Sequence, residues 1–532
     1  MPLLKRNDPV DACIIGAGAS GAVVAKKLGE AGLKVVVLDA GPRFTPERDY
    51  RTAKPDFEVT GPRVFQTSDP RRDRYTWEGV PWFRYSRVKG IGGSTLIYVG
   101  VSPRFHASDF RLRTLEGVAD DWPFRYRDLA PYYDEIERDL GVAGENNNPF
   151  DVPRGPYPNP PHPFNCASLT IKRGCEKLGW HLVHSPLANI SRNYDGRPAC
   201  IRCGACRMGC LIRAKSSVDV VYIPKAEATQ HVEIRPECMA REITLDAQGR
   251  AGSVIYFDPN GVEREQKARV IVLAANAVET PRLLLMSTSN RFPDGLANRS
   301  GLVGRYFMEH LAVFGWAIFP ERINAYQGIP AGGMIQDFYE TRPEHDFVRG
   351  WMFEVNNGWE WPLSVARRLP GWGQEHKERM REVFGHMTGL ATVGEQLPDK
   401  DNRIVLDPEV TDNYDLPVPR IAWRLSENDE RMIKAIKQRM VELFQAAGAE
   451  EIIEPRFVPG GSSHYMGTCR MGENPDSSVV DPWCRSHDVP NLFIVDSSVF
   501  VTGAAVNPAL TIQAIAARAA DYMVESGKRG EL

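Results

Sequence analysis

The first forty residues constrain the fold of this 532-residue chain more than any other segment. They read as a buried strand, a glycine-rich turn, a helix, a second strand and an acidic residue, all closely spaced. In order, these are 11–15, the run Gly16-Ala-Gly18-Ala-Ser-Gly21, 22–31, 34–38 and Asp39. This order and spacing are typical of the first βαβ unit of a Rossmann-like, doubly wound α/β domain.

Each residue of this unit has a physical reason to be there. Gly16 permits a tight turn, Gly18 lets the backbone approach a pyrophosphate, and Gly21 allows the helix to pack closely on the strand. The phosphates would lie at a helix N-terminus, where free N–H groups and the helix dipole favour negative charge. Asp39 can accept both ribose hydroxyls and would repel an adenosine 2′-phosphate. The unit predicts dinucleotide binding and disfavours an NADP-type ligand, and it leaves FAD and NAD as alternatives.

Composition places the chain among globular proteins and excludes some function classes. Hydrophobic residues make up 42% and charged residues 25%, which is enough for a well-buried core. The net charge of −3 gives no basic field for nucleic acid or an anionic membrane. No signal peptide and no apolar run of membrane-spanning length are visible. We expect a cytoplasmic protein with no membrane span, with export alongside a signal-bearing partner left open.

Several later stretches carry a family resemblance. They include GIGGSTLIY at 90–98, HYMGTCRMG at 464–472, NLFIVDSSV at 491–499 and NPALTIQAIA at 507–516, with shorter matches at 274–281, 301–308 and 401–407. Together with the N-terminal unit, these resemble the glucose–methanol–choline (GMC) family of flavin oxidoreductases, nearly end to end. The resemblance implies FAD as the dinucleotide and hydride transfer from the CH–OH group of a sugar, glycoside or other alcohol.

The family fold implies two discontinuous parts in an α/β protein. One is a Rossmann-like FAD-binding domain, and the other is a substrate domain built on an antiparallel sheet. We expect the first from residues 1–115, 198–310 and 456–532, and the second, with its connections, from 116–197 and 311–455. The proline-rich stretch 147–164 suits a surface connection between them, because proline excludes helix interiors and central strands.

The resemblance also assigns a catalytic pair. His464, which begins the HYMGTCRMG stretch, corresponds to the family's base for the hydroxyl proton. Asn507, ahead of Pro508, corresponds to its partner, which orients the substrate oxygen and holds an alkoxide-like transition state. A neutral imidazole suits proton removal near pH 7. We interpret His310, in the stretch after 301, as structural.

Further residues are expected at the flavin. By resemblance, Gly92, Gly93 and Ser94 lie against the flavin and its phosphates, and Asp496 lies near the pyrophosphate and ribityl chain. Met239 is expected to give adenine a backbone contact. Tyr98 stands where many members have asparagine. Ile97 stands where some sugar oxidases have the histidine that tethers the flavin, so we expect non-covalent FAD.

Four cysteines need their own explanation. Cys200, Cys203, Cys206 and Cys210 have the spacing of a bacterial ferredoxin run, without the usual proline after the last. Some family members hold an iron–sulfur cluster at this place. The hypotheses are an iron–sulfur cluster, a zinc site, and free thiols or a local disulfide.

We therefore expect a dehydrogenase or oxidase of a small alcohol or sugar, with oxygen or a redox partner as electron acceptor. The alternatives are an electron-relay flavoprotein subunit with an iron–sulfur cluster, and a lyase or isomerase on the same scaffold. The substrate, the acceptor and the oligomeric state stay open.

Overall fold

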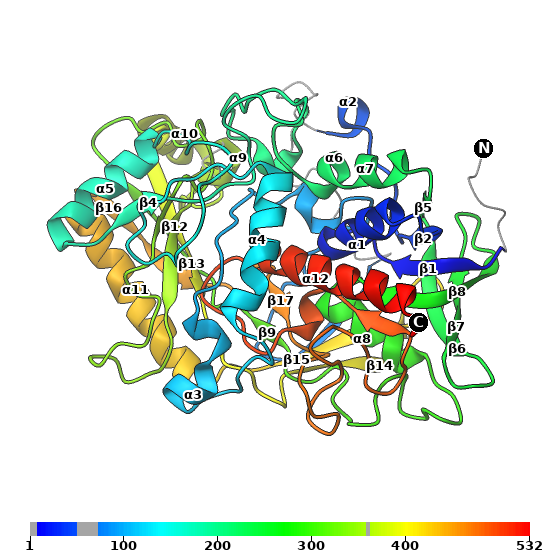
Figure 1. Ribbon diagram of the computed structural model, residues 1–532. Helices are drawn as coiled ribbons and strands as arrows, with labels where there is room; N and C mark the ends of the chain where they lie inside the picture. Colours follow the sequence, from blue (N-terminus) through cyan, green and yellow to red (C-terminus); the bar gives the residue numbers. More distant parts are fainter. Residues whose placement is uncertain (1–7, 51–72, 358–361) are drawn as a thin grey trace.

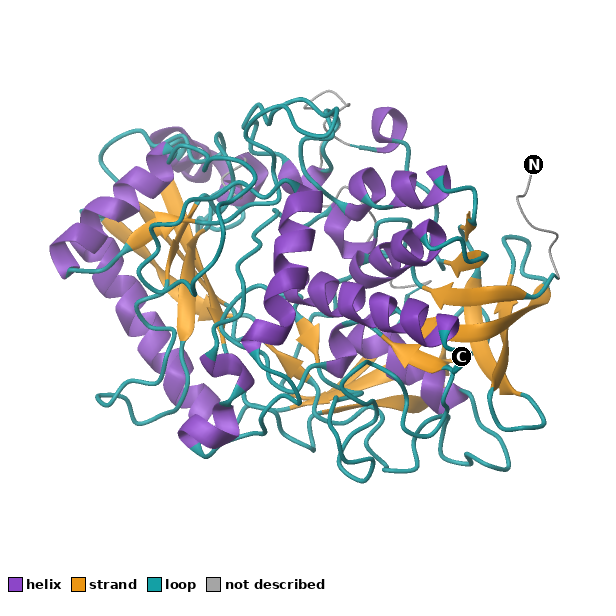
Figure 2. Ribbon diagram, viewed as in Figure 1, coloured by secondary structure: helices purple, strands orange, loops and turns teal. Residues whose placement is uncertain are grey.

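The computed structural model describes residues 8–50, 73–357 and 362–532. Two parts are evident, each built around its own sheet (Figures 1 and 2). On the right in Figure 1, the N-terminal strands and the C-terminal helix lie together although they are far apart in sequence. On the left, a second sheet carries long helices on its outer face.

The first sheet is mainly parallel and has the order β5-β2-β1-β8-β7-β6, with β18 pairing β8. Strands β5, β2, β1, β8 and β18 pair in parallel, whereas β6, β7 and β8 form an antiparallel run. The strands are β1 (Val10–Ile15), β2 (Val35–Leu38), β5 (Val232–Arg235), β6 (Met239–Leu245), β7 (Ala251–Phe257), β8 (Glu263–Leu273) and β18 (Leu492–Ile494). All residues of β2 and β18 are buried, as expected for parallel strands covered on both faces.

Helices cover this sheet. Helix α1 (Ala19–Glu30) packs against α12 (Ala509–Lys528) and α7 (Ile223–Ala228), and α12 packs against α4 (Tyr126–Leu140). Helix α8 (Asn276–Met286) follows β8 directly and contacts β6. Small buried residues of α1 and α12, among them Ala22, Ala516 and Ala520, let these helices pack closely against their neighbours.

The second sheet has the order β16-β10-β13-β12-β11-β4, and every pairing in it is antiparallel. Its strands are β4 (Leu182–His184), β10 (Val313–Ile318), β11 (Gly333–Ile335), β12 (Trp351–Val355), β13 (Met387–Gly394) and β16 (Glu451–Phe457). Helices α11 (Glu427–Ala447) and α5 (Cys166–Leu178) pack against each other and against this sheet. A capping box at Ser426 and Asp429 fixes the start of α11.

Smaller elements join the two parts. A three-stranded sheet, β14-β15-β3, packs on α8, and a two-stranded pair, β17-β9, lies beside it. These strands are β3 (Thr76–Gly79), β9 (Met308–Glu309), β14 (Arg403–Thr411), β15 (Pro417–Trp423) and β17 (Tyr465–Met466). The short helices are α2 (Pro46–Asp49), α3 (Leu112–Glu116), α6 (Val218–Val221), α9 (Pro362–Ala366) and α10 (Gly373–Val383). The 3-10 turns are η3 (Gly93–Leu96), η4 (Ser108–Phe110), η5 (Cys206–Met208) and η6 (Ser497–Val499).

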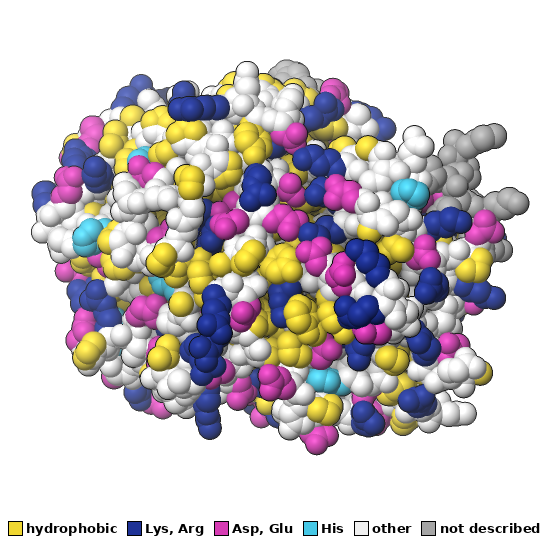
Figure 3. Space-filling view, in the orientation of Figure 1, with side chains coloured by type: hydrophobic (Ala, Val, Ile, Leu, Met, Phe, Trp, Pro, Cys, Tyr) yellow, Lys and Arg dark blue, Asp and Glu magenta, His cyan; other side chains and the backbone are white. Residues whose placement is uncertain are grey.

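The architecture confirms the predicted α/β class, with one parallel and one antiparallel sheet. The exact domain boundaries stay a prediction, since β16 runs across the expected change at 455/456. Within the described residues, no helix is both long and apolar enough to cross a membrane. Acidic and basic side chains are interspersed on the face shown in Figure 3, without one dominant sign.

Candidate active site

One cavity of about 1050 Å³ runs from the dinucleotide motif to the second sheet. Its volume suits a large cofactor and a small substrate together. Most of the residues predicted for the site line it: Gly16, Gly18, Asp39, Gly93, Ser94, Tyr98, Met239, His464, Asp496 and Asn507. The four clustered cysteines are not among its lining residues.

At one end lies the predicted nucleotide site. The carboxylate of Asp39, at the end of β2, accepts hydrogen bonds from the Ala17 and Gly41 N–H groups, both at 2.9 Å. Burial raises the pKa of Asp39, and these N–H donors oppose that shift. Two backbone donors thus fix the carboxylate at the mouth of the β1–α1 turn, where a ribose would lie.

Two close backbone approaches explain the glycines of this end. A Cβ on Gly21 would lie 1.9 Å from the Gly16 carbonyl oxygen, so only glycine lets α1 start against β1. Gly93, with φ +54°, brings its backbone against Gly18, and a Cβ there would lie 2.9 Å from the Gly18 Cα. Gly92, just before it, is also left-handed and is the N-cap of η3. The two glycine motifs are therefore in direct backbone contact, and Gly18 and Gly93 expose bare backbone at the cavity wall.

Three other predicted cofactor residues line the same cavity in different ways. Asp496 is buried and caps η6, and its carboxylate accepts from Ser498, Asn276 and Thr280, at 2.9, 3.1 and 2.5 Å. It therefore holds α8 and η6 together at the cavity wall. Met239 starts β6 beside Asp39. The Tyr98 hydroxyl donates to the Ser216 carbonyl at 2.7 Å, which leaves its ring on the wall.

His464 lies at the other end, just before β17. The preceding turn is held by Glu309, whose carboxylate accepts from the backbone N–H groups of Ser462 and Ser463 at 3.0 and 3.1 Å. Burial raises the pKa of Glu309 to about 8, against these hydrogen bonds. Burial, His310 and Arg207 together hold the pKa of His464 well below its usual value, so its imidazole is neutral near pH 7.

The two histidines form a hydrogen-bonded pair, with 2.9 Å between the His310 and His464 Nδ1 atoms. The other ring nitrogen of His310, Nε2, faces the carbonyl oxygens of Gly503 and Ala504, at 3.1 and 2.9 Å. Carbonyls only accept, so Nε2 must carry a proton. Burial lowers the pKa of His310 to about 4, so its Nδ1 is an acceptor near neutral pH. His464 then donates from Nδ1, and its Nε2 keeps a free lone pair.

Asn507 stands at the same end of the cavity, beside Glu354 of β12. The two side chains are hydrogen-bonded, and because a carboxylate only accepts, the Asn507 amide nitrogen is the donor. Burial raises the pKa of Glu354, opposed by Asn507 and the guanidinium of Arg207. The Asn507 oxygen and one Glu354 oxygen have no hydrogen-bond partner in the described part of the chain.

The cysteine run gives no support to the iron–sulfur or zinc hypotheses within the described residues. The cysteines are free, and no three or more His, Cys, Asp or Glu side chains of the described residues are placed to hold a metal ion. Cys203 is exposed, whereas Cys206 is buried among apolar side chains, which raises the pKa of its thiol. The run instead carries Arg207, in η5, to the cavity wall.

Two functional candidates were missed by sequence reasoning. Arg207 lies inside the cysteine run, whose spacing points only to its thiols. Glu354 is the one charged residue of β12, whose other members are apolar (WMFEV). A lone carboxylate in a fully buried strand is a signal that could have been read. His310, expected to be structural, touches His464 directly.

Comparison with known proteins agrees with this arrangement. Two models of the GMC oxidoreductase family match residues 10–312 and 398–516. The chain is 35% identical to 2-methyl-1,2-propanediol dehydrogenase of Mycolicibacterium austroafricanum, covering 97% of this chain and 95% of that protein. It is 30% identical to the fructose dehydrogenase large subunit of Gluconobacter japonicus, covering 98% of each.

Among solved structures, formate oxidase from Aspergillus oryzae superposes with a TM-score of 0.70 at 16% identity, over 99% of this chain and 100% of that one. This likeness supports the fold. Both family models, the two-sheet architecture and the cavity between the glycine motifs and His464 lead to one conclusion. The chain belongs to the GMC oxidoreductase family, and it is an FAD-dependent enzyme that oxidises the CH–OH group of alcohols or sugars.

Proposed function

We propose that His464 removes the hydroxyl proton of an alcohol or sugar while the substrate's CH–OH carbon is oxidised in this cavity. The observation that carries the proposal is the His310–His464 pair, which presents a neutral imidazole with a free Nε2 at the cavity wall. A positioned base of this kind contributes about 10²- to 10⁴-fold to proton transfer.

The nucleotide end fits FAD. Gly18 and Gly93 offer bare backbone at the cavity wall for a pyrophosphate, and the fixed Asp39 carboxylate suits ribose hydroxyls. Met239 would contact adenine, and Ser94, Tyr98 and Asp496 would border the flavin side of the cavity. FAD, when bound, supplies the hydride acceptor. Electrons then leave to oxygen or an external acceptor.

The residues divide the work at the reacting oxygen. The Asn507 amide nitrogen carries two hydrogens, and one of them goes to Glu354. The second is free to donate to the substrate oxygen as it loses its proton, which stabilises the developing alkoxide. His310 keeps the base in its accepting tautomer. Arg207 opposes protonation of His464 through its own positive charge.

Anaerobic rapid mixing tests the proposal. Purified holoenzyme is mixed with primary and secondary alcohols, diols and sugars, and the absorbance of oxidised flavin is followed. We expect bleaching with some members of the panel, and loss of that bleaching in His464→Gln with FAD content unchanged. Bleaching at the wild-type rate in His464→Gln would remove this residue as the base. An absence of bound flavin, even after FAD is added, would overturn the whole proposal.

A further inference from the structure

One face of the antiparallel sheet forms the floor of the substrate end. Phe314 of β10, Ala391 of β13 and Glu354 of β12 lie in one row across it, and all three line the cavity. The opposite face of the sheet packs against α11 and α5. Glu354 is therefore the only carboxylate of β10, β12 and β13 that the cavity reaches.

Five cavity-lining residues hold buried polar atoms with no hydrogen-bond partner among the described residues: Arg87, Trp316, Glu354, Asn356 and Asn507. For the last three, which lie at the substrate end, these atoms are Glu354 Oε1, Asn356 Nδ2 and Asn507 Oδ1. Asn356 follows Glu354 by two positions at the end of β12, so both point to the same side of the strand. Buried polar groups left unpaired are costly, and a cluster of them beside a cavity indicates a ligand that pairs with them. Two acceptors and one donor match hydroxyl groups, which both donate and accept.

The charges around Glu354 narrow the chemistry. Arg207 lies close enough to act on the pKa of both Glu354 and His464, and burial lowers the pKa of Arg207 itself to about 10. Arg84, Arg367 and Arg368 also line the cavity. A substrate ammonium would meet this excess of guanidinium groups, so one carboxylate does not make a cation site here. A neutral hydroxyl donor is the group that Glu354 suits.

We infer that the substrate is a vicinal diol or a polyol containing one, with Glu354 accepting a hydrogen bond from the hydroxyl next to the carbon that is oxidised. The inference rests on the proposed function, because Asn507 places the reacting oxygen. Asn507 and Glu354 are hydrogen-bonded to each other, so the two substrate oxygens that they receive must also be neighbours. Oxygens on adjacent carbons in a gauche diol lie at about hydrogen-bonding separation, near ~2.9 Å.

Asn356 extends the same site. Its Nδ2 donor, two residues beyond Glu354, is available to an oxygen of the substrate that Glu354 cannot serve. A sugar or polyol carries such an oxygen, whereas a simple diol does not. We therefore expect Asn356→Ala to weaken polyol turnover while it leaves simple diols nearly unaffected.

The experiment uses three alcohols of nearly equal size: trans-1,2-cyclohexanediol, 1,3-cyclohexanediol and cyclohexanol. kcat/KM is measured from flavin reduction by the holoenzyme. A hydrogen bond to a charged acceptor gives the 1,2-diol an advantage of about 10- to 100-fold over the other two. Glu354→Gln should reduce the ratio of kcat/KM between the 1,2-diol and the other two alcohols several-fold. Glu354→Leu should bring that ratio close to one. Glu375→Gln, on the exposed first turn of α10, serves as the matched control and should keep the wild-type ratio.

Binding gives a second readout that needs no turnover. Pinacol, a vicinal diol without a carbinol C–H, should inhibit wild-type competitively and about tenfold better than 2,3-dimethyl-2-butanol, and Glu354→Leu should lose that difference. Equal use of the three cyclic alcohols, or preference for the 1,3-diol, overturns the inference and leaves the proposed oxidation standing. Failure of every alcohol, diol and sugar to reduce the flavin overturns the proposed function, and the inference with it.

Discussion

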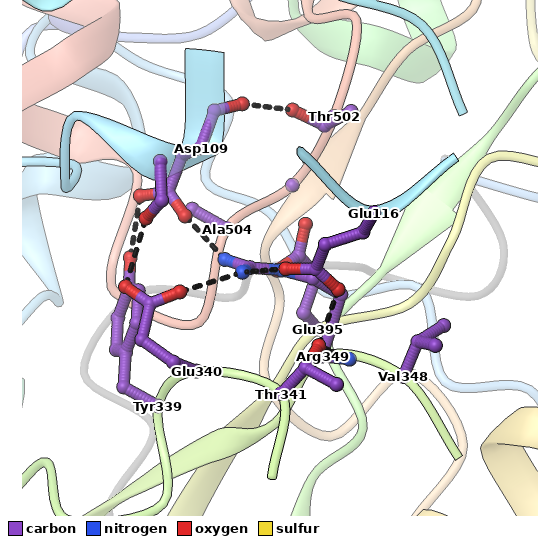
Figure 4. A network of polar contacts seen from close by, with 12 residues as sticks. Asp109, Glu116, Tyr339, Glu340, Thr341, Val348, Arg349, Glu395, Thr502 and Ala504 are labelled. Atoms are coloured by element: carbon purple, nitrogen blue, oxygen red, sulfur yellow. Dashed lines mark hydrogen bonds and ion pairs between the residues drawn. The ribbon is translucent and has the colours of Figure 1, made fainter. Parts of the chain in front are cut away.

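Two buried polar clusters of this enzyme differ in how far their hydrogen bonds are satisfied. In the first, Arg349 is fully buried and all three guanidinium nitrogens are paired (Figure 4). Its partners are Asp109, Glu116, Glu340 and Glu395, of which Glu395 keeps one oxygen without a partner among the described residues. In the second, Glu354, Asn356 and Asn507 each keep an unpaired polar atom within the described part of the chain.

The difference suits the Arg349 cluster to stabilising the fold and the Glu354 cluster to binding a substrate. The Arg349 cluster joins η4 and α3 to the start of β12 and the end of β13. The Asp109 carbonyl also accepts from the Thr502 hydroxyl, next to the Gly503 and Ala504 carbonyls that hold His310. It ties the second sheet to the loop whose carbonyls accept from His310. The Glu354 cluster ties little together and leaves capacity for a substrate. The cluster around the fully paired Arg349 should therefore govern stability, and the cluster in which every member keeps an unpaired atom should govern turnover.

The largest expected effect comes from the catalytic end. His464→Gln removes the free Nε2 and should lower the rate of flavin reduction by about 10²- to 10⁴-fold. The fold should survive, because Gln keeps a polar group beside His310. Stopped-flow reduction measures the rate, and the unfolding midpoint in urea serves as the stability control. A loss of stability that matches the loss of rate would show that this end builds the fold as well.

Breaking the Arg349 cluster should have the opposite effect, which is a large loss of stability. Arg349→Met leaves Asp109 and Glu395 buried without their cation, which should cost about 3–5 kcal/mol of unfolding free energy. Arg127→Met, in α4, is the control: this arginine is exposed, pairs with the neighbouring Asp128, and should lose less than about 1 kcal/mol. Urea denaturation followed by circular dichroism compares them. Equal losses in the two variants would contradict the distinction.

The incomplete cluster gives the contrasting stability test. Asn356→Leu removes a buried amide whose nitrogen has no partner among the described residues. Replacing an unpaired polar group with an apolar one of similar size should leave the unfolding free energy within about 1 kcal/mol of wild type, or raise it. The same urea experiment measures it. A loss of more than about 2 kcal/mol would mean that this amide is structural.

Removing the tautomer control should cost an intermediate amount of activity. His310→Phe keeps a ring of similar size but no acceptor for the His464 Nδ1 hydrogen, so both His464 tautomers become populated. We expect flavin reduction to slow by about tenfold, the effect of losing one hydrogen bond that orients the base. His310→Gln offers a carbonyl acceptor at about the same place and should recover part of the rate. A rate in His310→Phe equal to wild type would leave His310 with a packing role.

The sequence was informative where one backbone motif demands one geometry. The sequence placed Gly16 and Gly21 because only glycine fits the turn and the helix contact. It placed Asp39 and the neighbouring strands because the βαβ unit has a fixed order. The two-sheet architecture and His464 came from the family resemblance. Arg349 and Glu354 could not be found this way. Their partners are distant in sequence and meet only after both sheets have formed.

The cysteine run shows the other limit. Spacing left a shared metal or cluster as one hypothesis beside free thiols, but ligation also requires that the side chains converge, and in the described residues they are not placed to hold a metal ion. Cys206 packs into an apolar cluster instead, with Val99, Leu187 and Ile329. The spacing of cysteines in sequence does not predict which side chains each thiol contacts in the fold.

The smallest expected effect concerns Arg207, which should change the pH dependence of turnover. Its positive charge lowers the pKa of His464, after burial and His310. Protonated His464 cannot accept the hydroxyl proton, so kcat/KM should fall on the acid side with a midpoint below the usual histidine value of about 6.5. Arg207→Gln removes a charge that opposes protonation, so the pKa of His464 rises and the acid limb moves to higher pH. Arg202→Gln, exposed in the same loop, should leave the profile unchanged. An acid limb that stays in place in Arg207→Gln would mean that Arg207 only shapes the cavity, and that burial and His310 alone keep the base neutral.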